Sequence, residues 1–222
     1  MRSPAFRRVL DEIGSAVVGG EFAEGSRTSV DALVDRTLAS RSIVREATRV
    51  LAALGLLSAS PRVGLVVQPA GAWNLLDPQV VRWRLAGPAR ERQLRELREL
   101  RAALEPAAAR AAAAHATPAA RTRLRELAHR LAPTADFPRL DAELHDLVLR
   151  SSGNALFVHL ANVVGLAVHD RAGVDPDPHD VVLHAALARA VADADADAAD
   201  AAVREIVART QPSESTTVIS GA

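Results

Sequence analysis

The sequence predicts a mainly α-helical protein with two parts, an N-terminal unit of three helices and a β-hairpin followed by an antiparallel helical bundle. Three observations support this fold class. Apolar residues recur at helical spacing through most of the 222 residues. The period changes to short, strand-like runs only between residues 56 and 68. Proline, glycine or aspartate separates the successive helical segments of the C-terminal part.

The N-terminal unit has the element order of a winged helix-turn-helix. Residues 5–18 form an amphipathic pattern with its apolar residues on one face. Ser29 and Ser40 are suited to cap two further helices, because their hydroxyl groups can accept from free backbone N–H groups. A hairpin is expected over residues 56–68. Three helices and a hairpin in this order predict a DNA-binding winged helix-turn-helix over residues 1–70.

The middle of the chain predicts a connecting segment. Residues 71–88 contain several prolines and glycines, and one short helix is expected to start near Pro78. Both tryptophans of the chain, Trp73 and Trp83, lie in this segment. Their large apolar rings are expected to anchor the linker against one of the two domains.

The C-terminal part predicts a bundle of about six helices over residues 89–210. Its first helical run extends from Arg90 to Ala114 and is interrupted only by Pro106. Residues 211–222 are rich in serine and threonine and have no apolar period, so a disordered tail is expected there.

The composition excludes some classes of site and function but does not identify one function. The formal net charge is zero, so any case for DNA binding depends on where the charges lie along the chain. All 27 basic residues are arginine, the side chain best suited to bidentate recognition of phosphate and guanine. The absence of cysteine excludes disulfides and thiolate metal sites. No secretory signal or membrane-spanning run is visible, so a cytoplasmic protein without a membrane partner is expected.

A row of arginines marks the third expected helix as a recognition helix. Arg41, Arg45 and Arg49 are spaced four residues apart and therefore share one face, opposite the apolar one. Such a helix fits the major groove, with its first residues at the base edges. Arg62 and Gly64 lie at the tip of the expected wing, where an arginine can enter the minor groove. The alternative is a solvated basic face with no ligand.

In the bundle, two side chains are spaced for a common ligand. Asp141 and His145 are four residues apart on one helix face and could both coordinate one metal ion, although a surface ion pair is the alternative. His184 lies in a later helix, and Asn154 follows a Ser-Ser-Gly break. Carboxylate and imidazole side chains facing a bundle core are a familiar metal-site layout.

The DNA-binding part resembles the GntR family of transcriptional regulators. The resemblance rests on Ser40-Arg41-Ser42-Ile43-Val44-Arg45-Glu46-Ala47, on Leu54-Gly55-Leu56-Leu57 and on the wing glycine Gly64. It implies that Arg41 and Arg45 contact DNA, with Ser40 and Ser42 in the same motif. One departure is Asp31, because some relatives have a DNA-contacting arginine early in the second helix.

The bundle resembles the FCD effector domain of the FadR-type GntR subfamily. The matching segments are Arg101-Ala102-Ala103-Leu104-Glu105, Asp141-x-x-x-His145, Gly153-Asn154 and His184-x-x-Leu187. Members of that subfamily often hold a divalent metal, zinc or similar, with one aspartate and three histidines, and the metal helps to bind a carboxylate effector. The fourth ligand would fall 22 residues after His184, where this chain has Ile206.

The resemblance therefore implies a metal site of at most Asp141, His145 and His184, completed by water or effector. It also implies that Arg101, near the mouth of the bundle, pairs with the effector carboxylate, with Asn154 as a second effector residue. The alternative for Arg101 is one member of a solvated run of Arg and Glu residues. The linker segment Trp73-Asn74-Leu75-Leu76-Asp77 resembles the sugar-acid-sensing group of the subfamily.

Three functions remain open from the sequence. The first is a homodimeric repressor that binds double-stranded operator DNA and is released by a small carboxylate, such as a sugar acid. The second is a metal-dependent helical-bundle enzyme in which Asp141, His145 and His184 activate water. The third is a regulator whose bundle serves only for dimerisation. We expect a regulator rather than an enzyme, because no separate acid–base residue accompanies the three ligands.

Overall fold

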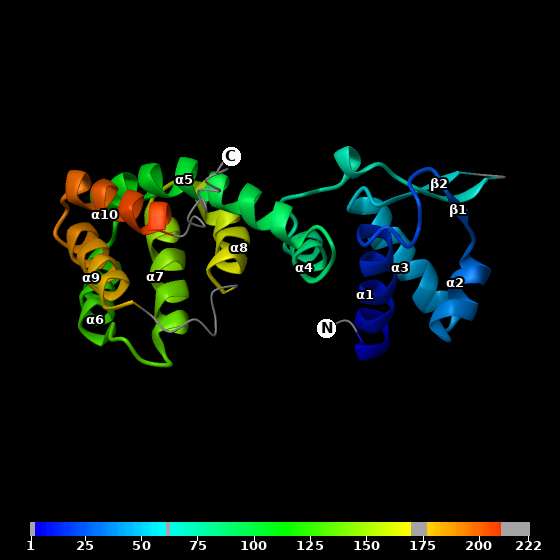
Figure 1. Cartoon of the computed structure of the whole chain (residues 1–222), viewed down its shortest axis with the longest axis horizontal. Helices are drawn as coiled ribbons and strands as arrows, with labels where there is room; N and C mark the ends of the chain where they lie inside the picture. Colours follow the sequence, from blue (N-terminus) through cyan, green and yellow to red (C-terminus); the bar gives the residue numbers. More distant parts are fainter. Residues whose placement is uncertain (1–2, 61–62, 170–176, 210–222) are drawn as a thin grey trace, which may run out of the picture. The chain divides into compact units, whose positions relative to one another are not determined.

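The computed structural model describes residues 3–60, 63–169 and 177–209. Its contacts divide the chain into two compact units, which meet in sequence between Arg95 and Glu96 (Figure 1). The N-terminal unit contains the winged helix-turn-helix elements, and the C-terminal unit is a helical bundle. This arrangement confirms the predicted fold class. The expected disordered tail at 211–222 lies outside the described residues.

The N-terminal unit is built on helices α1 (Pro4–Val18), α2 (Val30–Thr37) and α3 (Arg41–Ala53). The predicted serine caps are present. Ser29 Oγ accepts from the N–H of Ala32 at 3.1 Å, and Ser40 Oγ accepts from the N–H of Ile43 at 3.4 Å. The apolar faces of the three helices and the strands form one core, which includes the buried residues Phe6, Val9, Ile13, Leu33, Val44, Ala47, Leu51 and Leu56.

The wing contains the expected hairpin and one strand that the sequence did not reveal. Strands β2 (Leu57–Ser60) and β3 (Gly64–Val67) pair antiparallel, with Leu57 opposite Val67. Strand β1 (Arg27–Thr28) pairs with the other edge of β3, giving the order β1-β3-β2 in the described residues. Its two residues are too few to show the alternation by which a strand is recognised.

The segment after the wing is fastened to the N-terminal unit. It forms a short 3₁₀ turn, η1 (Ala70–Ala72), and helix α4 (Pro78–Ala86). Trp83 Nε1 donates to Asp11 Oδ1 of α1 at 3.0 Å, and its ring lies against Gly14, where a Cβ atom would overlap it. Trp73 Nε1 donates to the carbonyl of Gln68 at 3.0 Å. The expected anchoring by both tryptophans is therefore confirmed, and the N-terminal unit is the partner.

The C-terminal bundle consists of the long helix α5, from Glu96 onward, and of five further helices in the described residues. Their bounds are α5 (Arg90–His115), α6 (Pro118–Arg130), α7 (Phe137–Ser151), α8 (Ala155–His169), α9 (Pro178–Ala192) and α10 (Ala196–Arg209). The predicted interruption at Pro106 is wrong, since α5 continues through that residue. Proline removes one backbone N–H, and tertiary packing of the flanking turns outweighs that loss. Among the described residues no helix could cross a bilayer, because none combines the length and the apolar character required.

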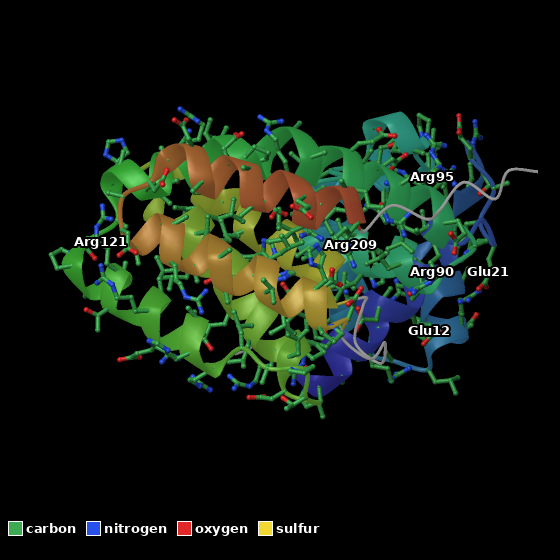
Figure 2. All side chains as sticks on the ribbon, turned by 60° about the vertical axis from the view of Figure 1, so that its left-hand side comes forward. Glu12, Glu21, Arg90, Arg95, Arg121 and Arg209 are labelled. Atoms are coloured by element: carbon green, nitrogen blue, oxygen red, sulfur yellow. The ribbon has the colours of Figure 1, made fainter. Side chains whose placement is uncertain are left out.

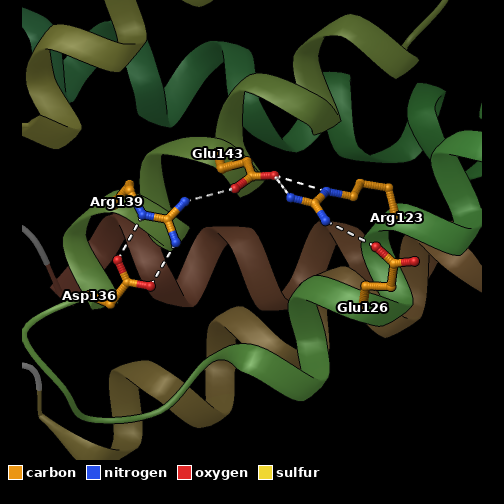
Figure 3. A network of polar contacts seen from close by, with 5 residues as sticks. All are labelled: Arg123, Glu126, Asp136, Arg139 and Glu143. Carbon is orange, nitrogen blue, oxygen red and sulfur yellow. Dashed lines mark hydrogen bonds and ion pairs between the residues drawn. The ribbon is translucent and has the colours of Figure 1, made fainter.

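Polar contacts support the helix packing at two places. Arg121, labelled in Figure 2, donates to the carbonyls of Ala113, Ala116, Val191 and Ala192 at 2.8–3.1 Å, and so satisfies the C-terminal ends of α5 and α9. On the surface, Glu143 of α7 accepts from Arg123 of α6 and from Arg139 (Figure 3). Solvent-accessible ion pairs such as those of Glu143 contribute little to the stability of the fold.

Candidate DNA-binding surface and buried effector site

Helix α3 presents the three predicted arginines on one exposed face. Val44 and Leu51 are fully buried on the opposite face, whereas Arg41, Arg45 and Arg49 are exposed. The apolar face fixes the helix against α1, because every fourth residue returns to the same side. This geometry is compatible with a recognition helix, because its basic face is exposed.

The arginines of this face differ in their partners. Arg41 forms an ion pair with Asp31 of α2. Arg45 and Arg49 form no ion pair with any residue in the described part of the chain. Ser40 and Ser42 lie at the start of α3, with their hydroxyl oxygens 3.0 Å apart. The start of α3 thus carries two hydroxyl groups and the paired Arg41, and Arg45 follows one turn later.

The wing tip is only partly described. Gly64 has a φ of +88°, and a Cβ atom there would lie 2.9 Å from the carbonyl oxygen of Thr28. The β1-β3 pairing therefore requires glycine at this position, whether or not Gly64 also contacts DNA. Arg62 lies outside the described residues, so its expected contact with the minor groove stays a prediction.

The three predicted metal ligands come together inside the bundle. Asp141 and His145 belong to α7, and His184 belongs to α9. Asp141 Oδ1 lies 3.1 Å from His145 Nε2 and 3.0 Å from His184 Nε2, and the three ligand atoms lie within 4.8 Å of one another. All three side chains are at most 4% exposed. The alternative of a surface ion pair between Asp141 and His145 is therefore wrong.

The arrangement of these atoms suits a shared proton or metal ion. His184 Nδ1 lies 2.5 Å from the backbone carbonyl of Asp180, which can only accept, so Nδ1 carries a proton. Nε2 of His184 then faces Asp141 Oδ1 at 3.0 Å. Neither Asp141 Oδ1 nor His184 Nε2 has a hydrogen-bond partner among the described residues. Two buried acceptors that face each other are stable only with a proton or a metal ion between them.

Two charged residues of α5 complete the buried cluster. Glu105 Oε2 lies 2.6 Å from His145 Nδ1, and the other oxygen of Glu105 accepts from Arg101 Nε. Arg101 Nη2 in turn lies 3.5 Å from His145 Nε2. Arg101 and Glu105 are each 2% exposed, so Arg101 is neither part of a solvated run nor at an open mouth. In the sequence, Glu105 stood out only as part of the segment that resembles the FCD domain. Its contact with His145 could not be predicted, because the two residues are forty positions apart.

The charges of the cluster stabilise one another. Burial raises the pKa of Glu105, but the Arg101 charge and His145 outweigh it and lower that pKa to about 2. Burial lowers the pKa of His145, but Glu105 and Asp141 outweigh it and raise that pKa to about 9. The pKa of Asp141 is lowered in spite of its burial, because both histidines are close to it.

The remaining predicted residues lie in ordinary structural positions. Ile206 is 1% exposed and packs in the core of the bundle, so three protein ligands remain. Three ligands with an open position are typical of sites that also bind a water or a small ligand. Asn154 is exposed, and its side chain accepts from the N–H of Leu156 at the start of α8. Its contact with an effector stays a prediction.

Comparisons with known proteins agree with both halves of the chain. Residues 96–209 match the model of the FCD domain, the region that contains the buried cluster. The chain is 30% identical over 212 residues to the galactonate operon transcriptional repressor of Escherichia coli (strain K12), covering 90% of this chain and 93% of the relative. The chain belongs to the FadR-type branch of the GntR family, with an FCD domain.

Other relatives fit this family. The regulator is 26% identical over 200 residues to the uncharacterized HTH-type transcriptional regulator YieP of Escherichia coli (strain K12), covering 86% of this chain and 87% of the relative. Its fold matches that of a solved Streptococcus agalactiae GntR protein with a TM-score of 0.52 at 20% identity, over 91% and 97% of the two chains. The protein is therefore a DNA-binding transcriptional regulator, and the comparisons do not support the metal-dependent enzyme.

Proposed function

We propose that this regulator is a homodimeric, cytoplasmic repressor that leaves its operator DNA when a small carboxylate, such as a sugar acid, binds inside the FCD bundle. The observation that carries the proposal is the closed cluster of Arg101, Glu105, Asp141, His145 and His184. A protein gains little stability from burying so many ionisable groups, since apolar residues would pack as well. A cluster of this kind in a bundle core favours a role in ligand binding.

The donor set fits a divalent metal such as zinc. Asp141 Oδ1, His145 Nε2 and His184 Nε2 would hold it, and the unpartnered state of two of these atoms supports that assignment. Bound there, the metal would supply positive charge that attracts and orients a carboxylate. The carbonyl of Asp180 and the carboxylate of Glu105 orient the two imidazole rings from behind, as outer partners of metal-bound histidines commonly do.

Arg101 is the residue of this chain that recognises the acid. Its guanidinium is buried, Glu105 accepts from its Nε, and Nη2 makes a long contact of 3.5 Å with His145 Nε2, so Nη2 can turn to donate to a carboxylate. A sugar acid is favoured because a relative at 30% identity is named for a galactonate operon. Asn154 is kept as a second candidate contact, although its side chain serves the start of α8.

The closed state of the cluster couples effector binding to a change of shape. The five clustered side chains are almost inaccessible, so an acid can reach Arg101 only when the bundle opens. An effector that binds the open form shifts the population toward it. In a dimer bound to two half-sites, such a shift changes the spacing of the two α3 helices and weakens DNA binding.

The proposal is tested by fluorescence anisotropy of labelled duplex DNA from upstream of the regulator's own gene. The protein is titrated at two salt concentrations, with zinc or with a chelator, and with a panel of sugar acids that includes galactonate. We expect sequence-dependent, salt-sensitive binding that one acid relieves. An Arg101→Gln variant should bind the same DNA but no longer respond to the acid. If no acid changes binding or raises the melting temperature of the wild-type protein, the bundle is a dimerisation module only.

A further inference from the structure

We infer that Asp31 is a specificity-determining residue of the DNA-binding surface, because it holds the Arg41 guanidinium and thereby disfavours random DNA more than the operator. The inference rests on the proposed contacts of α3 with DNA. It concerns a position where the sequence alone indicated only that a possible contact was absent.

The ion pair joins the first turns of two helices. Asp31 is the second residue of α2, and Arg41 is the first residue of α3. The carboxylate of Asp31 contacts Nη2 of Arg41, and the two side chains are 63% and 60% exposed. An arginine expected at the base edges is therefore already oriented by a neighbour in the same unit.

The pairing is selective within this surface. Arg45 and Arg49 follow Arg41 on the same face and have no ion pair in the described residues. Arg36 of α2 is directed elsewhere, since it pairs with Glu12 and Glu21. Within the part of the chain that the structure describes, Arg41 is the one of these three arginines that pairs with a carboxylate.

The chemistry of the guanidinium explains how one carboxylate affects the two kinds of DNA differently. The guanidinium carries five N–H donors in a rigid fork, so Arg41 can keep Asp31 on one edge and present another edge to O6 and N7 of guanine. Binding to random DNA instead depends on neutralising phosphates. A carboxylate beside Arg41 offsets part of its charge and repels the phosphates, so random DNA loses more binding free energy than a site with a correctly placed guanine does.

A purely structural role for Asp31 predicts something else. An acidic residue in the first turn of α2 also favours the N-terminal end of the helix dipole. Loss of that effect would lower the melting temperature slightly and leave discrimination between DNA sequences unchanged. The ratio of affinities therefore separates the two roles.

The experiment uses the full chain and two duplexes of equal length, one enriched from a random pool by the wild-type protein and one of random sequence. Affinities are measured by anisotropy over a series of salt concentrations for wild type, Asp31→Ala and Asp35→Ala. Asp35 is a matched control, because it is an exposed aspartate one turn later on α2. We expect Asp31→Ala to tighten binding to random DNA about tenfold and binding to the enriched duplex less than threefold.

The salt dependence provides a second readout. For random DNA, Asp31→Ala should add about one to the slope of log affinity against log salt, because one more phosphate is neutralised. In an Arg41→Ala background, Asp31→Ala should no longer change the affinity ratio. The inference is overturned if Asp31→Ala changes the ratio no more than Asp35→Ala does. A wild-type protein with no preference for either duplex would instead overturn the proposed DNA contacts.

Discussion

The contact between Glu105 and His145 gives a sharp test of the buried site. We consider Glu105→Gln, which keeps the size of the side chain and removes its charge. In the wild type, one carboxylate oxygen lies 2.6 Å from His145 Nδ1 and the other accepts from Arg101. A glutamine has one acceptor oxygen and one NH₂ group. It can therefore satisfy His145 or Arg101, but its NH₂ group must face the donor of the other.

The size of the effect follows from this loss of one charged acceptor. Outer partners of metal-bound histidines typically contribute tenfold to a hundredfold to metal affinity, or about 1.4 to 2.7 kcal/mol. We therefore expect zinc to bind Glu105→Gln at least tenfold more weakly than the wild type. The variant should also unfold more easily by about 3 kcal/mol, because Arg101 is left buried without its anionic partner.

Zinc affinity is measured by competition with a chelating chromophore, at a temperature where circular dichroism shows the variant to be folded. Glu143→Gln is the matched control. It makes the same chemical change on the surface of α7, where Glu143 contacts Arg123 and Arg139 (Figure 3). Equal zinc affinities for Glu105→Gln and the wild type, with binding abolished by His184→Ala, would refute the orienting role of Glu105.

Three further predictions concern other parts of the molecule. Arg45→Ala should weaken operator binding by about 1–3 kcal/mol in an anisotropy titration and random-duplex binding by less, and equal losses on both would show that Arg45 reads no base. Arg121→Ala should destabilise the bundle by ~2 kcal/mol, because four backbone carbonyls lose a charged donor, and thermal unfolding checks this. Gly14→Ala should lower the melting temperature, at a cost of about 1–3 kcal/mol, because its Cβ would overlap the Trp83 ring. An unchanged or higher melting temperature would contradict that packing.

Much of the fold could be predicted from the sequence because its signals are local. Serine caps at Ser29 and Ser40 and the period of the apolar residues determine where α2 and α3 begin and which faces are buried. The hairpin followed from a change of period. Strand β1 could not be predicted, because a two-residue strand is recognised by its pairing with Leu65 and Val66 of β3 and not by its own pattern. Pro106 was misjudged for a related reason, because packing and not local propensity decides the path of α5.

The candidate sites divide in the same way. The arginine face of α3 and the spacing of Asp141 and His145 follow from the sequence, because residues four apart share a face of any helix. The distance of 3.0 Å between His184 and Asp141, the burial of Arg101 against Glu105 and the ion pair of Asp31 with Arg41 emerge from the packing of the folded chain. These contacts join residues of different helices or set how deeply a residue is buried. They depend on how the helices pack, and helical periodicity carries no information about that packing.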